Sequence, residues 1–335
     1  MKVCVVGAGA IGGLLGARLA DAGQDVSLVA RGAHLAAIRE HGLKLIGDGG
    51  EITVDNVTAT DDISDLGVQD VVLLALKSHQ IAAVAKQLPG LFGEHTVMVT
   101  LQNGIPWWYF QKLQSEYAGR VVESVDPGGM LAATFDPDSI LGCIAYPAAV
   151  ISAPGVITHI EGIRLPLGEL DGTDSARANR VAQMLIRAGF KSPVLADIRA
   201  EIWLKLWGNL CFNPISALTH ATLEGICRFP LSRELAATMM DEARRIAEKL
   251  GIGFRTTLER RIEGAEKVGK HKTSMLQDVE AGKQLEIDGM LGAVIELADL
   301  TDTEVPALRS IYACVSLLDD TIAKQTISIK GRPLR

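Results

Sequence analysis

Short apolar runs alternate with helical patterns along the first part of the chain. The segments that follow the first and third runs have apolar residues at the three- and four-residue spacing of a helix with one buried face. Strands that alternate with helices in this way are typical of a parallel, doubly wound sheet. The four predicted strands are residues 2–6, 26–30, 71–76 and 97–101.

A hairpin and a change of pattern complete the first half of the chain. Residues 43–46 and 52–57 flank a glycine-rich turn and predict a hairpin. Residues 121–168 form short β-rich pieces broken by Gly and Pro, which we expect to be antiparallel strands that extend the sheet. Residues 175–188 predict a helix, and a last strand is expected near Val194.

After Asp197 the strand signals nearly vanish and helical periodicity takes over, with Ser232 as a candidate N-cap. We therefore predict an α/β chain in which an N-terminal Rossmann-type dinucleotide-binding domain, residues 1–196, precedes an all-helical C-terminal domain, residues 197–335.

Composition and charge exclude several classes of protein. The 335 residues are 48% hydrophobic and 22% charged, as in soluble globular proteins with two buried cores. The net charge of -7 argues against nucleic acid and anionic membranes as partners. The start of the chain lacks the layout of a signal peptide, and the uncharged residues 139–160 are broken by Pro and Gly. We expect a cytoplasmic protein with no membrane span.

Cysteine and histidine give no sign of a metal site. The five cysteines are odd in number and scattered, and the seven histidines have no ligand spacing. We expect buried thiols in a reducing compartment and no metal.

A glycine turn follows the first predicted strand. Gly7, Gly9 and Gly12 fit the pattern GxGxxG, in which glycines let the backbone approach a pyrophosphate at the start of a helix. A tight turn with a close contact between helix and strand is the structural alternative. The position of the motif, after a strand and before a helix, favours a dinucleotide site. The turn consists of Gly7, Ala8, Gly9, Ala10, Ile11 and Gly12.

Three further residues follow predicted strands, where doubly wound sheets bind ligands. Arg31 follows the second strand, where NAD-binding proteins carry an acidic residue, and it favours NADP(H) through bonds to a 2'-phosphate. Lys77 follows the third strand and could approach anions of the cofactor or substrate. Asn103 follows the fourth and could contact nicotinamide, ribose or the reacting oxygen. The alternatives are a solvated arginine and simple turn residues.

Polar residues also gather in the predicted helical domain. Lys205, Asn209 and Asn213 recur every four residues and share one face of an otherwise apolar helix. Ser274 is followed twelve residues later by Glu286. A proton-donating lysine, amides and a carboxylate suit carbonyl reduction beside a nicotinamide. Alternatively, Lys205 extends to the surface and Glu286 only favours a helix start.

Together these pieces resemble the ketopantoate reductase (2-dehydropantoate 2-reductase) family over nearly the full chain. The resemblance rests on the turn Gly7–Gly12, Arg31, Lys77-Ser78, Gln102-Asn103-Gly104, Lys205 with Asn209 and Asn213, Ser274 to Asp278, and Glu286-Ile287-Asp288.

This resemblance implies NADPH-dependent reduction of ketopantoate to pantoate, and a place in pantothenate and coenzyme A synthesis. Lys205 would be the general acid, and Glu286 would bind the substrate hydroxyl and orient Lys205. Asn103, Asn209, Asn213 and Ser274 would contact the substrate.

Some residues depart from the family pattern. Leu291 stands where many members have asparagine, and the aromatic run 107–110 and the segment 123–127 are unusual. The run is either core or the wall of a pocket for a bulkier 2-keto acid, which is the alternative substrate. A second alternative is a non-catalytic NADP(H)-sensing protein. The helical domain and the aromatic residues are compatible with a homodimer.

Overall fold

The structure, a computed structural model, describes residues 1–331 and consists of two compact units. Unit 1 holds Met1–Gln102, Trp107–Val121 and Gly128–Ile198. Unit 2 holds Asn103–Pro106, Val122–Pro127 and the chain from Arg199 onward. The assignment of residues 1–196 to NADP(H) binding and 197–335 to catalysis stays a prediction, and residues 332–335 lie outside the described part.

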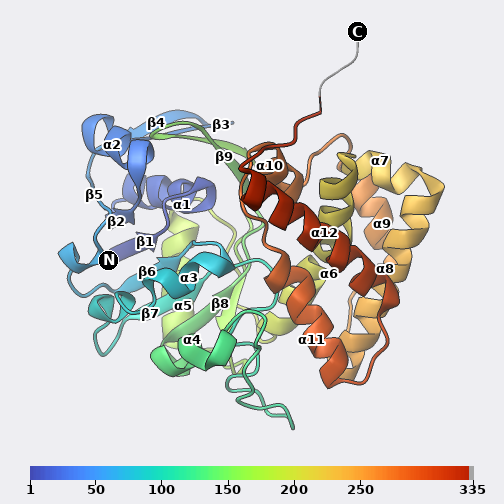
Figure 1. The fold of residues 1–335 in the computed structure, drawn as a ribbon. Helices are drawn as coiled ribbons and strands as arrows, with labels where there is room; N and C mark the ends of the chain where they lie inside the picture. The colour runs from blue at the N-terminus through green and yellow to red at the C-terminus, as the bar shows by residue number, and fades with distance from the viewer. Residues whose placement is uncertain (332–335) are drawn as a thin grey trace. The chain divides into compact units, whose positions relative to one another are not determined.

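Unit 1 is built on a seven-stranded sheet in the order β11-β8-β7-β6-β1-β2-β5 (Figure 1). Every pair is parallel except β11 with β8. The central strands are buried on both faces, which explains their continuous apolar runs. The strands are β1 (Lys2–Val6), β2 (Asp25–Val29), β5 (Val57–Thr60), β6 (Val71–Leu74), β7 (Val97–Thr100), β8 (Ile140–Cys143) and β11 (Leu167–Glu169).

A second, four-stranded sheet has the order β4-β3-β10-β9. Its strands are β3 (Leu43–Gly47), β4 (Gly50–Val54), β9 (Ala148–Ala153) and β10 (Val156–Glu161). The predicted hairpin is confirmed as β3 and β4, but its second run ends at Val54, and Val57 begins β5 in the main sheet. The expectation that residues 121–168 extend the main sheet is wrong for β9 and β10. Ile157 of β10 packs instead on Gly13, where a Cβ would lie 2.7 Å from its Cδ1.

Five α-helices belong to unit 1 within the described residues. They are α1 (Ala10–Asp21), α2 (Gly32–His41), α3 (Ser78–Val84), α4 (Met130–Thr134) and α5 (Ala176–Arg187). The short α4 falls where only strands were expected. Ser175 caps the predicted helix α5 by accepting a hydrogen bond from the Ala178 N–H at 3.0 Å. Short 3-10 turns occur at Ile63–Asp65, Leu88–Leu91, Pro127–Gly129 and Pro137–Ser139.

The aromatic run 107–110 lies in the core of unit 1, with each side chain no more than 3% exposed. Trp108 Nε1 donates to Thr100 Oγ1 at 2.9 Å, and Tyr109 meets Phe110 edge to face. The core interpretation of these residues is therefore confirmed, and their rings do not wall an open pocket.

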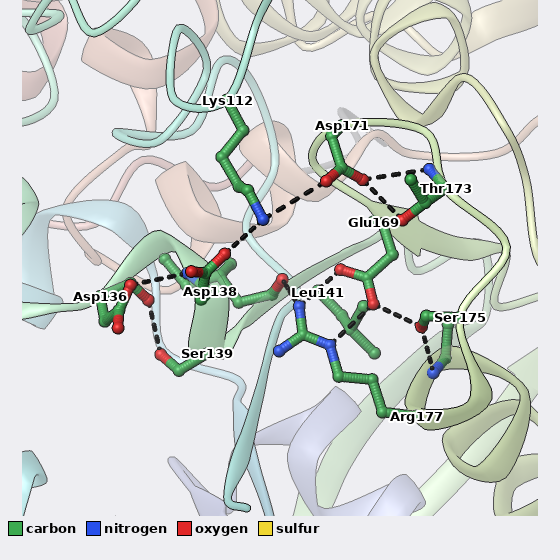
Figure 2. A network of polar contacts seen from close by, with 12 residues as sticks. Lys112, Asp136, Asp138, Ser139, Leu141, Glu169, Asp171, Thr173, Ser175 and Arg177 are labelled. Atoms are coloured by element: carbon green, nitrogen blue, oxygen red, sulfur yellow. Dashed lines mark hydrogen bonds and ion pairs between the residues drawn. The ribbon is translucent and has the colours of Figure 1, made fainter. Parts of the chain in front are cut away.

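An ionic network closes the β8–β11 edge of the sheet (Figure 2). The buried Glu169 accepts hydrogen bonds from Arg177 Nε at 2.7 Å and Nη2 at 2.5 Å, and from Ser175 Oγ at 2.5 Å. Lys112 pairs with Asp138 and, at 3.3 Å, with Asp171. Since Glu169 lies on β11 and Arg177 on α5, the network fastens the start of this helix to the last strand.

Unit 2 is helical in the described chain beyond Ile198 (Figure 1). Its longest helix, α6, contains Pro214. The predicted start of a helix at Ser232 is wrong, because Pro230 opens α8 and Phe229 is its N-cap. The helices are α6 (Ile198–Thr219), α7 (Leu223–Arg228), α8 (Pro230–Lys249), α9 (Leu258–Lys267), α10 (Ser274–Glu280), α11 (Ala293–Leu300) and α12 (Pro306–Gln325), with a π-helical turn (Asp288–Gly292) before α11.

The cysteines are all free, but they are not all buried as expected. Cys314 on α12 is exposed, whereas Cys4, Cys143, Cys211 and Cys227 are buried. Burial raises the pKa of Cys4 to about 12 and that of Cys227 to about 11. Across residues 1–331 no helix combines the length and apolar character that crossing a membrane requires.

Candidate functional site

Helix α6 carries three of the predicted site residues at successive turns. Lys205 and Asn209 are half-buried, and Asn213 is buried. The neighbouring Trp203 and Trp207 fill the core, and Trp207 Nε1 donates to the Met240 carbonyl oxygen at 2.7 Å. The apolar faces of α6 therefore fix its rotation in the unit, and its polar stripe is held in one orientation.

A chain of hydrogen bonds joins Lys205 to Glu286 through Asn103, and all three residues belong to unit 2. Lys205 Nζ donates to Asn103 Oδ1 at 2.7 Å, and Asn103 Nδ2 donates to Glu286 Oε2 at 3.4 Å. Lysine can only donate and a carboxylate can only accept, so this chain fixes which end of the amide faces which partner. We refer to these three residues as the relay.

The segments that carry Asn103 and Glu286 are also tied by their backbones. The Ile105 N–H donates to the Gly289 carbonyl oxygen at 2.8 Å. Gly104 has a φ of +85°, and a Cβ there would lie only 2.1 Å from that same oxygen. Glycine is therefore required at position 104 for both its conformation and the close approach.

Two residues predicted to bind the substrate, Asn209 and Asn213, differ in their contacts. Asn213 Nδ2 lies 3.7 Å from Met290 Sδ, in the turn that follows Glu286. The half-buried side chain of Asn209 forms no hydrogen bond within residues 1–331.

Ser274 is exposed as the first residue of α10, whose N-cap is Thr273. No hydrogen bond joins the Ser274 side chain to the relay in the described structure. Its substrate contact, like those of Asn103, Asn209 and Asn213, stays a prediction.

The glycine turn of unit 1 has a backbone suited to a pyrophosphate. Gly7 has a φ of +99°, and a Cβ on Gly12 would lie 2.0 Å from the Gly7 carbonyl oxygen. At Gly9, the N-cap of α1, a Cβ would have no neighbour within 4 Å. The first turn of α1 contains no acidic residue. The start of α1 thus offers an anion open space and backbone N–H groups, and its first turn has no carboxylate to repel the anion.

The two cationic residues predicted to bind the cofactor lie at the starts of helices, after the carboxyl ends of strands. Arg31, after β2, is the exposed N-cap of α2, and Lys77, after β6, is the N-cap of α3. Gln102 Nε2 donates to the carbonyl oxygens of Leu74 at 2.7 Å and Leu76 at 3.2 Å. It therefore fixes the ends of β6 and β7, which precede Lys77 and Asn103.

A cavity of about 740 Å³ in unit 1 lies elsewhere. Its lining includes Thr96 and Val97 at the amino end of β7, with Phe135, Arg177 and Arg180. Doubly wound sheets bind ligands at the opposite, carboxyl ends of their strands, so this cavity is not the candidate site.

Two residues near Glu286 were missed by the sequence patterns. Asp319 accepts a hydrogen bond from the Leu285 N–H, and Tyr312 donates one to Asp288. The partners are 34 and 24 positions apart. No local spacing signals such contacts, because α12 reaches the segment only in the folded chain.

Comparisons with known proteins match nearly the whole chain. Residues 3–172 match the family described as ketopantoate reductase PanE/ApbA, and residues 197–319 match its C-terminal part. A curated 2-dehydropantoate 2-reductase of Mesorhizobium japonicum is 49% identical over 319 residues, covering 95% of this chain and 98% of that protein.

Solved structures of related proteins have the same fold as this chain. A protein of Ralstonia solanacearum MolK2, provisionally described as a ketopantoate reductase, has a TM-score of 0.91 and 37% identity over 96% of this chain and 98% of its own. D-mandelate dehydrogenase with NADH and anilino(oxo)acetate has a TM-score of 0.82 over 96% of this chain and 100% of its own, and its 21% identity shows the fold alone. The predicted family resemblance, the α/β and helical fold and the oxidoreductase class are confirmed.

Proposed function

Since the chain belongs to the ketopantoate reductase PanE/ApbA family, we propose that it reduces 2-dehydropantoate (ketopantoate) to pantoate with NADPH. The observation that carries the proposal is the relay, which joins a lysine, an amide and a carboxylate from three distant parts of the chain.

Lys205 is the proton donor of this proposal. An ammonium has three N–H bonds: one donates to Asn103 Oδ1, and we propose that another donates to the carbonyl oxygen of the substrate. As negative charge develops on that oxygen, Lys205 stabilises it and then transfers a proton. When bound, NADPH supplies the hydride for the carbonyl carbon.

Glu286 and Asn103 hold the donor in place. Asn103 keeps one N–H of Lys205 directed at its own oxygen, and Glu286 holds the other end of the same amide. A carboxylate has several acceptor positions, so Glu286 can also receive the hydroxyl of the substrate. Asn209, Asn213 and Ser274 supply further polar groups for the carboxylate and hydroxyl groups of the 2-keto acid.

Most of the proposed cofactor-binding residues belong to unit 1. The turn from Gly7 to Gly12, with Ala8, Ala10 and Ile11, receives the pyrophosphate at the start of α1. Arg31 pairs with a 2'-phosphate, which favours NADPH over NADH. Lys77 approaches anionic groups, and Asn103 contacts the nicotinamide or its ribose.

The test is an assay of NADPH consumption by the purified protein with ketopantoate, in parallel with NADH and with a panel of larger 2-keto acids. Fast, NADPH-selective turnover of ketopantoate supports the proposal. Turnover only with a larger 2-keto acid keeps the mechanism and replaces the substrate. No turnover with any 2-keto acid contradicts the proposal.

The departures from the family pattern do not favour the larger substrate. The run 107–110 fills the core of unit 1, and Leu291 is fully buried in the π-helical turn. The segment 123–127 is held by Glu296, which accepts from the Glu123 and Ser124 N–H groups at 2.8 Å each. The homodimer and the cytoplasmic location stay predictions.

A further inference from the structure

The backbone just before Glu286 is held by a side chain of α12. The Leu285 N–H donates to Asp319 Oδ1 at 2.8 Å, and Leu285 itself is 2% exposed. This N–H lies in a loop before the next helix, so it has no partner in a regular helix or strand. Asp319 therefore fixes the position of the chain one residue before the carboxylate of the relay.

The side chain of Asp288, two residues after Glu286, is bonded to the same helix. Tyr312 Oη donates to Asp288 Oδ1 at 3.1 Å. A Cβ on Gly292 would lie 3.3 Å from Tyr312 Oη and 3.6 Å from Asp288 Oδ1. Glycine at position 292 thus leaves room for this hydrogen bond beside the π-helical turn.

Spacing on α12 lets its two residues act together. Tyr312 and Asp319 are seven positions apart, so they lie about two turns apart on nearly the same face of the helix. A different part of the chain also bonds to the segment, because the Ile105 N–H donates to the Gly289 carbonyl oxygen. Glu286 therefore stands on a segment held by two other parts of the chain, next to a π-helical turn of the kind that often accompanies functional sites.

We propose that Asp319 and Tyr312 are positioning residues for Glu286, and this inference rests on the proposed function. Asp319 acts through the Leu285 N–H, and Tyr312 acts through Asp288. Together they keep the Glu286 carboxylate within reach of Asn103, whose amide holds Lys205. Within residues 1–331 no hydrogen bond joins either residue to the relay, so each acts on catalysis through the segment that it holds.

Two substitutions at position 319 distinguish loss of the hydrogen-bond acceptor from loss of the negative charge. Asp319→Ala removes the acceptor of the Leu285 N–H, whereas Asp319→Asn keeps an oxygen at the same place. We expect Asp319→Ala to lower kcat about tenfold to a hundredfold, as displacements near 1 Å can do, and to leave KM for NADPH unchanged. Asp319→Asn restores most of kcat, and Tyr312→Phe lowers kcat in the same direction. Asp320→Ala is the matched control, because Asp320 lies on the same helix and, within residues 1–331, pairs with Lys324 at 2.9 Å and not with the Glu286 segment.

A second measurement, NMR titration of the Glu286 carboxyl group, does not depend on enzymatic activity. In protein carrying carbon-13 in its glutamate carboxyl groups, the signal lost in Glu286→Gln identifies Glu286, and its change with pH reports its surroundings. We expect Asp319→Ala and Tyr312→Phe to shift this titration, and Asp320→Ala to leave it as in the wild type.

The outcomes separate the inference from the proposed function. Wild-type kcat and an unchanged Glu286 titration in Asp319→Ala would overturn the inference, as would an Asp319→Asn variant as impaired as Asp319→Ala. Should Asp319→Ala fail to fold, an unchanged titration in Tyr312→Phe has the same force. A wild-type protein that reduces no 2-keto acid contradicts the proposed function, while the titration still decides the positioning.

Discussion

Lys205 Nζ donates a hydrogen bond of 2.7 Å to Asn103 Oδ1, although 102 positions separate the two residues in the chain. Asn103 enters unit 2 in the short piece Asn103–Pro106, directly after the segment that ends β7 of unit 1. The amide is therefore set by the end of a strand and the ammonium by a long helix. Their meeting depends on the tertiary fold, so substitutions at either residue test the site as a whole.

Lys205→Ala removes the proposed proton donor. We expect kcat to fall by about two to four orders of magnitude, as for loss of a positioned acid, while the Kd for NADPH stays near the wild-type value. Lys205→Arg keeps the charge but holds its proton too tightly to transfer it, so it should remain impaired. Steady-state kinetics and NADPH fluorescence titration measure the two quantities. Full activity in Lys205→Ala would sink the mechanism.

Arg31→Ala tests the choice of cofactor. Loss of a hydrogen bond to a charged group costs about 1.5–3 kcal/mol, so we expect KM for NADPH to rise about tenfold to a hundredfold. KM for NADH, which lacks the 2'-phosphate, should hardly change. Arg39→Ala is the control, because Arg39 is exposed on the same helix and instead donates to the Ala59 carbonyl oxygen. An equal loss with both cofactors would contradict the role given to Arg31.

Glu169→Ala tests the network at the edge of unit 1. It leaves Arg177 without its two hydrogen bonds to a buried carboxylate. Breaking a buried pair costs about 3–5 kcal/mol, and because the Arg177 side chain is 25% exposed we expect about 2–4 kcal/mol of unfolding free energy to be lost. Glu94→Ala, at an exposed position of the same unit, should change it by less than about 0.5 kcal/mol. Urea unfolding compares the two variants.

The lowered pKa of Asp171 predicts how the stability of the fold changes at acidic pH. Hydrogen bonds from the Thr173 hydroxyl and N–H, and then from Lys112, lower its pKa from 3.8 to about 2. A carboxyl with a lowered pKa in the folded state contributes stability above its ordinary pKa, and this contribution disappears as pH falls from 3.8 toward 2. Thr173→Val removes the largest cause, so the pKa of Asp171 should rise toward its ordinary value. Carboxyl NMR titration of both proteins checks this, and an identical pKa in the two would refute the assignment.

We expect the five thiols to differ in reactivity, because Cys314 is exposed and the other four are buried. Burial keeps Cys4 and Cys227 protonated at neutral pH, and it raises the pKa of Cys211 well above its ordinary value. We expect a disulfide reagent to modify Cys314 rapidly in the native protein and the other four only after unfolding. Cys314→Ser should abolish the fast phase, and a fast phase that survives in this variant would contradict the burial of the others.

Local patterns predicted the parts of the fold that local sequence decides. The apolar runs of β1, β2, β6 and β7 and the four-residue spacing on α6 each reflect one element, and each element is present. The sheet that β9 and β10 join was mispredicted, because Ile157 finds its place on Gly13 of α1 and not on a neighbour in sequence. The contacts of Asp319 and Tyr312 were missed for the same reason. Asn103 was singled out by its place after a predicted strand and Glu286 by its place twelve residues after Ser274, but neither position could reveal that the two side chains meet.

The piecewise composition of unit 2 limits how the chain can be dissected. A fragment that begins at Arg199 would contain Lys205 and Glu286 but neither Asn103–Pro106 nor Val122–Pro127. It would lack the Asn103 amide, which bonds the other two relay residues, the N–H of Ile105 that holds Gly289, and the Ser124 hydroxyl that donates to Glu296 at 2.6 Å. Truncation or domain exchange at the apparent boundary therefore removes part of unit 2, and chimeras of this enzyme should carry these two short pieces together with the helices.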